Sequence, residues 1–88
     1  MHAVVVRSTL NDFDQARNDL KERVIPSARQ RPGFVAGQWV RLDDTTGTAM
    51  LTFETEEAAR GAAEALRTDP PVGVTVNSVE IGEVIARV

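Results

Sequence analysis

Residues 32–59 decide the fold of this chain, and they read PGFVAGQWVRLDDTTGTAMLTFETEEAA. Two segments, 34–42 and 48–54, are rich in β-branched, aromatic and other apolar residues, a composition that favours strands. The segment between them, 43–47, contains only Asp, Thr and Gly, which is typical of a hairpin loop. This stretch therefore predicts two neighbouring antiparallel strands joined by a short loop.

A helix is predicted directly after the second of these strands. Thr55 can cap it by accepting a backbone N–H, and the acidic Glu56 and Glu57 suit the positive end of the helix dipole. Apolar residues then recur at helical spacing and form one face, which consists of Ala58, Ala59, Ala62, Ala63 and Leu66. We expect the helix to end before Pro70-Pro71, because proline lacks the N–H that a helix needs.

The residues before this stretch predict a strand and a longer helix. Residues 2–8 contain three consecutive valines and form the strand. Asn11 or Asp12 can cap the helix, and its apolar stripe consists of Phe13, Ala16, Leu20, Val24 and Ala28. We expect a kink at Pro26, which cannot donate a hydrogen bond to the carbonyl of Glu22.

Residues 74–87 predict a fourth strand, in which the apolar alternation slips midway. A bulge near Asn77-Ser78 or Gly82 would explain the slip. The order of elements is then βαββαβ, the arrangement of ferredoxin-like folds. We expect residues 1–88 to form a single α+β domain, a four-stranded antiparallel sheet with two helices on one face.

The first three predicted strands are apolar on both faces, although two helices can cover only one face of a sheet. Two sheets packed face to face would bury the second face. The chain has only 88 residues, and a domain of this size buries too little surface to be very stable alone. The sequence therefore predicts a homodimer in the form of a dimeric α/β barrel.

The composition excludes several classes of protein. The chain has no Cys, so it cannot form a disulfide or a cysteine metal site. It has one His, so a metal site with several histidine ligands would need residues from a second chain. Its net charge of −3 argues against a nucleic-acid or membrane partner. The N-terminus does not resemble a signal peptide, and no segment approaches the ~20 apolar residues of a membrane span. We expect a cytoplasmic protein that needs no cofactor and no metal.

Two motifs resemble a known superfamily. One is Pro32-Gly33-Phe34, which opens a strand after a helix with an internal proline; the other is Phe53-Glu54-Thr55-Glu56-Glu57-Ala58-Ala59. Both resemble the dimeric α/β-barrel superfamily, most closely its antibiotic-biosynthesis-monooxygenase-like branch, over nearly the whole chain. Similar members include cofactor-free quinone-forming monooxygenases, haem-degrading enzymes, lactone isomerases and proteins with no known activity.

Haem degradation is not expected. The resemblance implies an Asn, a Trp and an axial His for that activity, and this chain has Asn11 and Trp39. Its one histidine is His2, for which an exposed terminal position is the simpler interpretation. The helical positions where that branch keeps its Trp and His hold Ala and Arg.

The candidate substrate-binding residues lie mainly on the second strand. The resemblance implies a polar side chain near a buried aromatic residue, which steers a phenolic substrate toward its anion. Trp39, Gln38 and Arg41, together with Arg7 from the first strand, would line such a pocket, and an arginine would stabilise the phenolate. The structural alternative is that Trp39 fills a core or a dimer seam. Arg7 and Arg41 would then pair with Asp43, Asp44 or Glu80.

Other polar residues have sufficient structural explanations. Asp43-Asp44 is typical of a solvated turn, and no third ligand lies nearby in the sequence to complete a metal site. The chain has no Tyr, so no phenolic proton donor is available. It also lacks a Cys-x-x-Cys motif and a Gly-rich phosphate loop. No catalytic residue is predicted.

Two functions remain. The first is a homodimer that binds a small hydrophobic or aromatic ligand between helices and sheet and oxidises it as a cofactor-free monooxygenase. The second is a non-catalytic dimer that binds a metabolite or a partner protein. The first function is the leading hypothesis. The argument for the second is the lack of a His, Cys or Tyr at the candidate site, since proton transfer needs a group that titrates near pH 7. The alanine face of the second helix leaves open whether a cavity separates it from the sheet.

Overall fold

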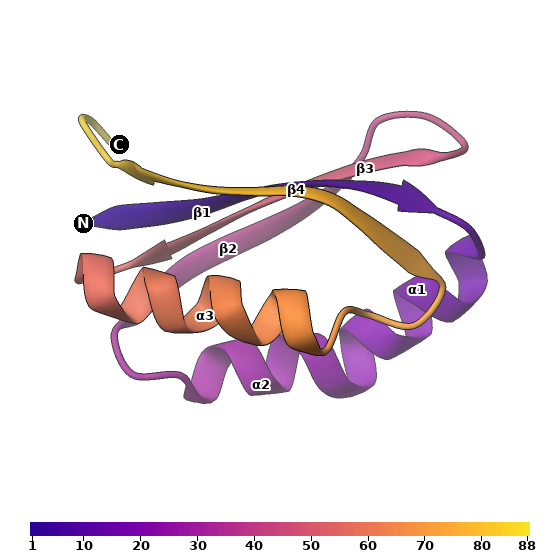
Figure 1. Ribbon diagram of the computed structural model, residues 1–88, viewed down its shortest axis with the longest axis horizontal. Helices are drawn as coiled ribbons and strands as arrows, with labels where there is room; N and C mark the ends of the chain where they lie inside the picture. Colours follow the sequence, from indigo (N-terminus) through magenta and orange to yellow (C-terminus); the bar gives the residue numbers. More distant parts are fainter.

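The computed structural model describes residues 1–88 and confirms the predicted α+β arrangement, which is consistent with a ferredoxin-like fold. One antiparallel sheet has the strand order β2-β3-β1-β4, and all helices lie on one of its faces (Figure 1). None of the helices is long and apolar enough to cross a lipid bilayer. The elements are β1 (His2–Leu10), α1 (Phe13–Asp19), η1 (Leu20–Val24), α2 (Ile25–Gln30), β2 (Phe34–Arg41), β3 (Thr46–Phe53), α3 (Glu56–Thr68) and β4 (Val74–Glu83).

Strand β1 lies in the centre of the sheet, where it pairs with β3 on one side and β4 on the other. Its side chains alternate between the two faces, as they do in any strand. Val4 and Val6 are buried beneath the helices, whereas Val5 and Arg7 are exposed on the opposite face. The face without helices is called the open face below.

The elements α1, η1 and α2 follow one another without a break and form one helical rod, residues 13–30. Asp12 caps it by accepting a hydrogen bond from the backbone N–H of Gln15. Of the two predicted caps, Asn11 and Asp12, the second is therefore the one used. A π-helical turn lies just before Pro26, where a kink is predicted, and in it the N–H of Ile25 donates to the carbonyl of Leu20. Such turns occur where a regular α-helical hydrogen bond is lost.

The predicted irregularity of the last strand is a bulge. Arg7 lies opposite Ser78 and Ser8 opposite Val76, so Asn77 is the extra residue. Asn77 is held by a hydrogen bond of 2.9 Å from its side-chain amide to the hydroxyl of Thr9. The bulge is therefore at the first of the two predicted positions, although the strand ends at Glu83 rather than at residue 87.

The loop between β2 and β3 has the turn that its residue types predict. The Asp43 carboxylate accepts a hydrogen bond of 2.9 Å from the backbone N–H of Thr45. This bond holds the pKa of the Asp43 carboxyl below its ordinary value. Asp43 therefore has a structural role in the turn, as expected.

The main hydrophobic core lies between α3 and the sheet. Thr55 caps α3 as predicted, by accepting from the N–H of Ala58 at 3.0 Å. The residue Phe53 is fully buried and meets Phe34 edge to face, with 5.8 Å between the ring centroids. The buried residues of this core are Val4, Val6, Ala49, Phe53, Ala59, Ala62 and Ala63.

The helical rod is tied to the loop between α3 and β4 by polar contacts. Arg23 donates to Asp19 on its own helix, with its Nη2 atom 2.8 Å from Oδ2, and to Asp69 beyond α3, also at 2.8 Å. Asp19 in turn accepts the backbone N–H of Val72 at 3.0 Å. Nearer the start of the rod, the backbone N–H groups of residues 11 and 12 both donate to the carbonyl of Gly73.

Candidate ligand-binding cavity

A cavity of about 570 Å³ lies between the helical rod, α3 and the sheet. Of the 28 residues that line it, 17 are hydrophobic, so its wall is mainly apolar. Small side chains create the space, because Ala16 and Ala28 of the rod and Ala62 and Ala65 of α3 all border it. The alanine face of α3 therefore does both things that the sequence left open, since Ala59 and Ala63 are fully buried in the core while Ala62 and Ala65 border the cavity.

Trp39 lines this cavity from β2 and also packs against the core. Gly37, two residues earlier on the same strand face, allows the indole ring to lie across the strand. A Cβ at Gly37 would lie only 3.2 Å from the ring atom Cη2 of Trp39. The two roles considered for Trp39, core residue and pocket residue, are therefore combined in one half-buried side chain.

Arg41 also lines the cavity, and it lies over the ring of Phe13 from the helical rod. Its guanidinium carbon is 3.8 Å from the ring centroid, which is a cation–π contact. Its Nη2 atom is 3.7 Å from a carboxylate oxygen of Asp44, one of the predicted partners. Asp44 is fully exposed, so this ion pair is weak.

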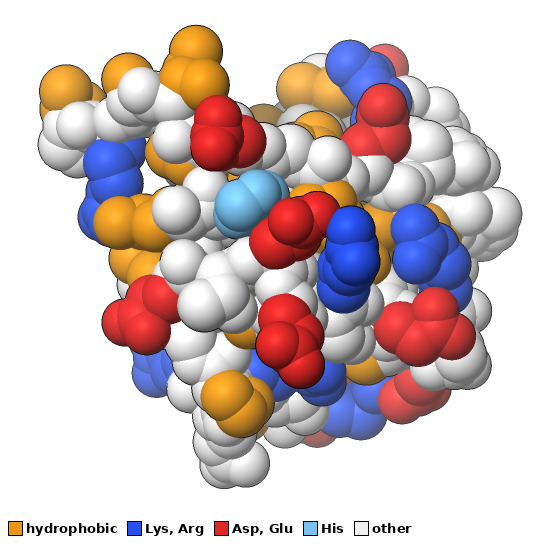
Figure 2. All heavy atoms as spheres, turned by 60° about the vertical axis from the view of Figure 1, so that its left-hand side comes forward, with side chains coloured by type: hydrophobic (Ala, Val, Ile, Leu, Met, Phe, Trp, Pro, Cys, Tyr) orange, Lys and Arg blue, Asp and Glu red, His pale blue; other side chains and the backbone are white.

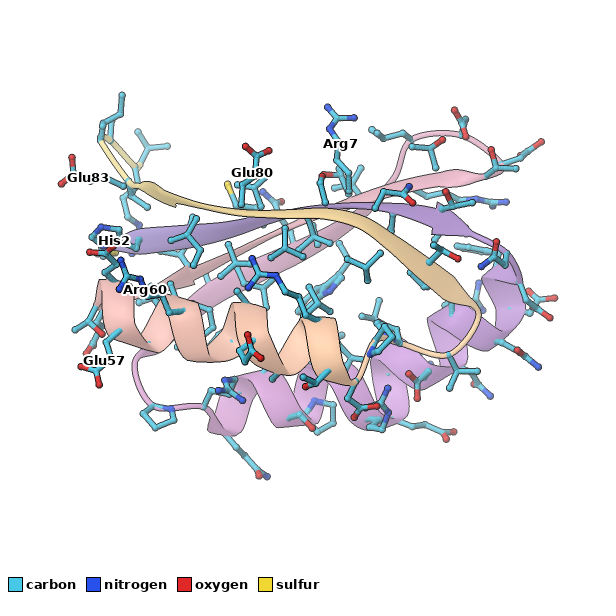
Figure 3. All side chains as sticks on the ribbon, in the orientation of Figure 1. His2, Arg7, Glu57, Arg60, Glu80 and Glu83 are labelled. Carbon is cyan, nitrogen blue, oxygen red and sulfur yellow. The ribbon has the colours of Figure 1, made fainter.

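Gln38 and Arg7 do not line the cavity. Gln38 follows the opposite parity from Trp39 on β2, and the inward residues of β1 are even-numbered, so both side chains lie on the open face. Figure 3 shows Arg7 pointing away from the helices. The structure therefore divides the four predicted residues into two pairs, with Trp39 and Arg41 at the cavity and Gln38 and Arg7 on the other side of the sheet.

Three wall residues from the rod and its end were not among the predicted site residues. Phe13 was assigned only to the apolar stripe, while Arg17 and Arg31 were not considered. Arg17 lies one turn after Phe13 on the same side of the rod. This spacing of four residues in the sequence could have identified Arg17 as a neighbour of Phe13. Arg31 reaches α3, where its Nη2 atom is within 3.1 Å of the place that a Cβ of Gly61 would take.

His2 lies outside the cavity, at the end of the sheet nearest the start of α3 (Figure 3). It is partly buried rather than fully exposed, because 25% of its side chain is accessible. Its Nε2 atom is 3.9 Å from Glu56, and its Nδ1 atom is buried without a hydrogen-bond partner. Figure 2 shows it at the surface among acidic side chains. Nowhere in the chain do three His, Asp or Glu side chains form a group that could hold a metal ion.

Comparison with known proteins gives no assignment. No protein-family model matches this chain, and searches of curated proteins and of solved structures find no significant match either. The resemblance to the dimeric α/β-barrel superfamily therefore stays a prediction, and the arguments below rest on the cavity and the surfaces of the chain.

Proposed function

We propose that this protein binds a small, largely apolar molecule in the cavity between the helical rod and the sheet. The mainly apolar wall around about 570 Å³ is the observation that carries this proposal. Small-molecule sites usually have volumes of ~300–1,000 Å³ and mostly hydrophobic walls. Protein interiors are otherwise close-packed, so an apolar space of this size needs an explanation.

An aromatic ligand fits this wall best. Trp39 is the largest side chain of the wall, and Phe13 also lines it, with its ring beside Arg41. Flat rings can stack on such side chains or meet them edge to face, which adds to the free energy of burial. The ligand class proposed is thus a small aromatic or alicyclic molecule.

Binding without chemistry is the favoured form of this function. The cavity wall contains no His, Tyr or Glu, and its one carboxylate, Asp69, is held by Arg23 at 2.8 Å. A general base near neutral pH is therefore missing from the wall. Cofactor-free oxygenation is the alternative, and sustained oxygen consumption by the purified protein with a panel of hydroquinones would establish it.

The proposal includes a homodimer that forms through the open face. Val5 and Met50 lie there and are 38% and 43% exposed, which leaves apolar surface without a partner. Arg7 and Glu80 project from the same face (Figure 3) and form no ion pair within the chain. A two-fold axis can bring opposite charges of two copies together, so this face suits a second copy of the chain.

Light scattering at micromolar concentration tests the dimer. We expect the mass of two chains for the native protein and of one chain for Met50→Asp, because a carboxylate would be buried in the interface. Val72→Asp is the matched control, since Val72 is exposed but lies outside the sheet. A monomeric native protein would refute the dimer and leave the cavity proposal standing.

A titration with phenylnaphthylamine, a neutral aromatic probe that fluoresces in apolar sites, tests the cavity. We expect saturation at one probe per chain and a loss of affinity of about tenfold in Trp39→Ala. Gln38→Ala is the control, because the neighbouring side chain lies on the open face. If the probe does not saturate, or if both variants bind it like the native protein, the cavity is not the binding site. Trp39→Phe serves as a milder variant if Trp39→Ala does not fold.

A further inference from the structure

The cavity wall carries a charge opposite to that of the whole chain. The chain has a net charge of −3. Four arginines but only one acidic residue line the cavity: Arg17, Arg23, Arg31, Arg41 and Asp69. The wall is therefore positively charged around an apolar interior, although acidic residues predominate in the sequence.

Arg17 and Arg41 are available to a ligand at the opening. Arg23 is not, because it is occupied by Asp19 and Asp69. Arg17 forms no ion pair or side-chain hydrogen bond within the chain, and the single ion pair of Arg41 is a 3.7 Å contact with a fully exposed carboxylate. Both side chains are exposed at the surface and also border the cavity, which places them at its mouth.

Arg17 and Arg41 both lie near Phe13 of the rod. Arg41 lies over its ring at 3.8 Å, and Arg17 follows it by one helical turn on the same face of the rod. Guanidinium groups are permanently charged and present a planar set of donors that matches a carboxylate. An apolar molecule that enters beside Trp39 would thus leave its polar end next to Arg17, which has no partner in the chain, and Arg41, which is only weakly paired.

We infer that the ligand is an organic acid, with an aromatic or alicyclic body in the cavity and a carboxylate held at the mouth by Arg17 and Arg41. This inference rests on the proposed function and adds the charge of the ligand to it. The carboxylate pairs with cations that have no adequate partner in the chain, while the body covers the apolar wall. A neutral ligand of the same shape gains only the burial of its body against the apolar wall.

A matched pair of competitors tests the inference. Naphthoate and naphthamide have nearly the same shape, but only naphthoate is charged, and each can displace phenylnaphthylamine from the native protein. We expect naphthoate to bind about tenfold more tightly at low salt, with the difference shrinking as salt is added. Arg17→Met and Arg41→Met should each weaken naphthoate about fivefold and leave naphthamide unchanged. Arg29→Met, which removes an exposed charge from the same rod outside the cavity, should change neither.

The outcomes separate the two proposals. If both competitors bind equally well, or if Arg17→Met and Arg41→Met weaken them equally, the inference is wrong and the apolar cavity stands. If neither competitor nor phenylnaphthylamine binds, the proposed function fails and the inference fails with it. Selective loss of naphthoate affinity in the two cavity variants supports both.

Discussion

The two halves of the layer between helices and sheet are built from similar side chains but differ in packing. In the packed half, Ala59 and Ala63 of α3 are fully buried against the sheet, and Phe53 fills the space beneath the helix. In the hollow half, Ala16 and Ala28 of the rod border the cavity instead. Alanine thus allows close approach in one half and leaves a space in the other.

The difference comes from how each helix is held. Helix α3 packs on β1, β3 and β4 through its apolar face, so burial of that face fixes its distance from the sheet. The rod meets the sheet mainly through α2 and β2, and it is fixed by Arg23, Asp19 and the carbonyl of Gly73. Polar ties at the rim can hold a helix in place without filling the space beneath it. A cavity can therefore persist in a chain of 88 residues.

Truncation of Phe53 should disrupt the packing between α3 and the sheet and cause the largest loss of stability. Phe53 is fully buried, and removal of such a ring usually costs ~3–5 kcal/mol, because transfer free energy is lost and a cavity remains. We expect Phe53→Ala to lower the free energy of unfolding by about this amount in urea titrations. Leu20→Ala in the hollow half should cost less than about 1.5 kcal/mol, since its side chain already borders empty space. Equal losses would show that the cavity is closed in solution.

Enlargement of an alanine should distinguish the two halves on a single helix. Ala63 is fully buried in the packed half, whereas Ala65 borders the cavity. Ala63→Leu overpacks the core and should cost ~1–3 kcal/mol. Ala65→Leu should change the free energy of unfolding little, because the added atoms enter the cavity, but it should weaken phenylnaphthylamine binding. Because both changes are from Ala to Leu on α3, differences in helix propensity cancel. A large loss in Ala65→Leu would mean that no space exists beside it.

The sequence predicted the elements well because their signals are local. The caps Asp12 and Thr55, the turn at Asp43 and the slip at Asn77 each follow from the nearest few residues. Two of the four candidate residues, Gln38 and Arg7, do not line the cavity, because strand alternation was not taken into account when they were chosen. Proximity of β1 to β2 was also assumed, whereas β3 separates these strands in the sheet.

The hollow half could not be predicted, because it depends on contacts between distant segments. Arg23 and Asp69 are 46 residues apart, and nothing in the local sequence of either one indicates the pairing. The apolar stripe of the rod correctly predicted which side faces the sheet. It could not indicate how far from the sheet the rod lies, and that distance determines whether a cavity exists.

Removal of the Asp19 carboxylate should weaken the polar contacts that hold the rod to the loop between α3 and β4. We expect this change to cause the smallest loss of stability of the three. Asp19 accepts hydrogen bonds from Arg23 and from the N–H of Val72, and these bonds lower its pKa from the ordinary value of 3.8. Asp19→Asn should lower the free energy of unfolding at neutral pH by about 1–2 kcal/mol. Because the pKa is lowered in the folded state, this stabilisation is complete well above pH 3.8 and is lost as the pH falls through the lowered pKa.

The native protein and Asp19→Asn should therefore differ in urea midpoint at pH 7 and converge in strong acid, if the protein remains folded there. Asp44→Asn is the control, since its carboxylate is fully exposed and should affect the midpoint little at either pH. If Asp19→Asn leaves the midpoint unchanged at neutral pH, the tie does not hold the rod. The space beneath the rod would then depend on its contact with β2. Loss of phenylnaphthylamine affinity in Asp19→Asn, with the fold intact, would instead show that the tie keeps the cavity open.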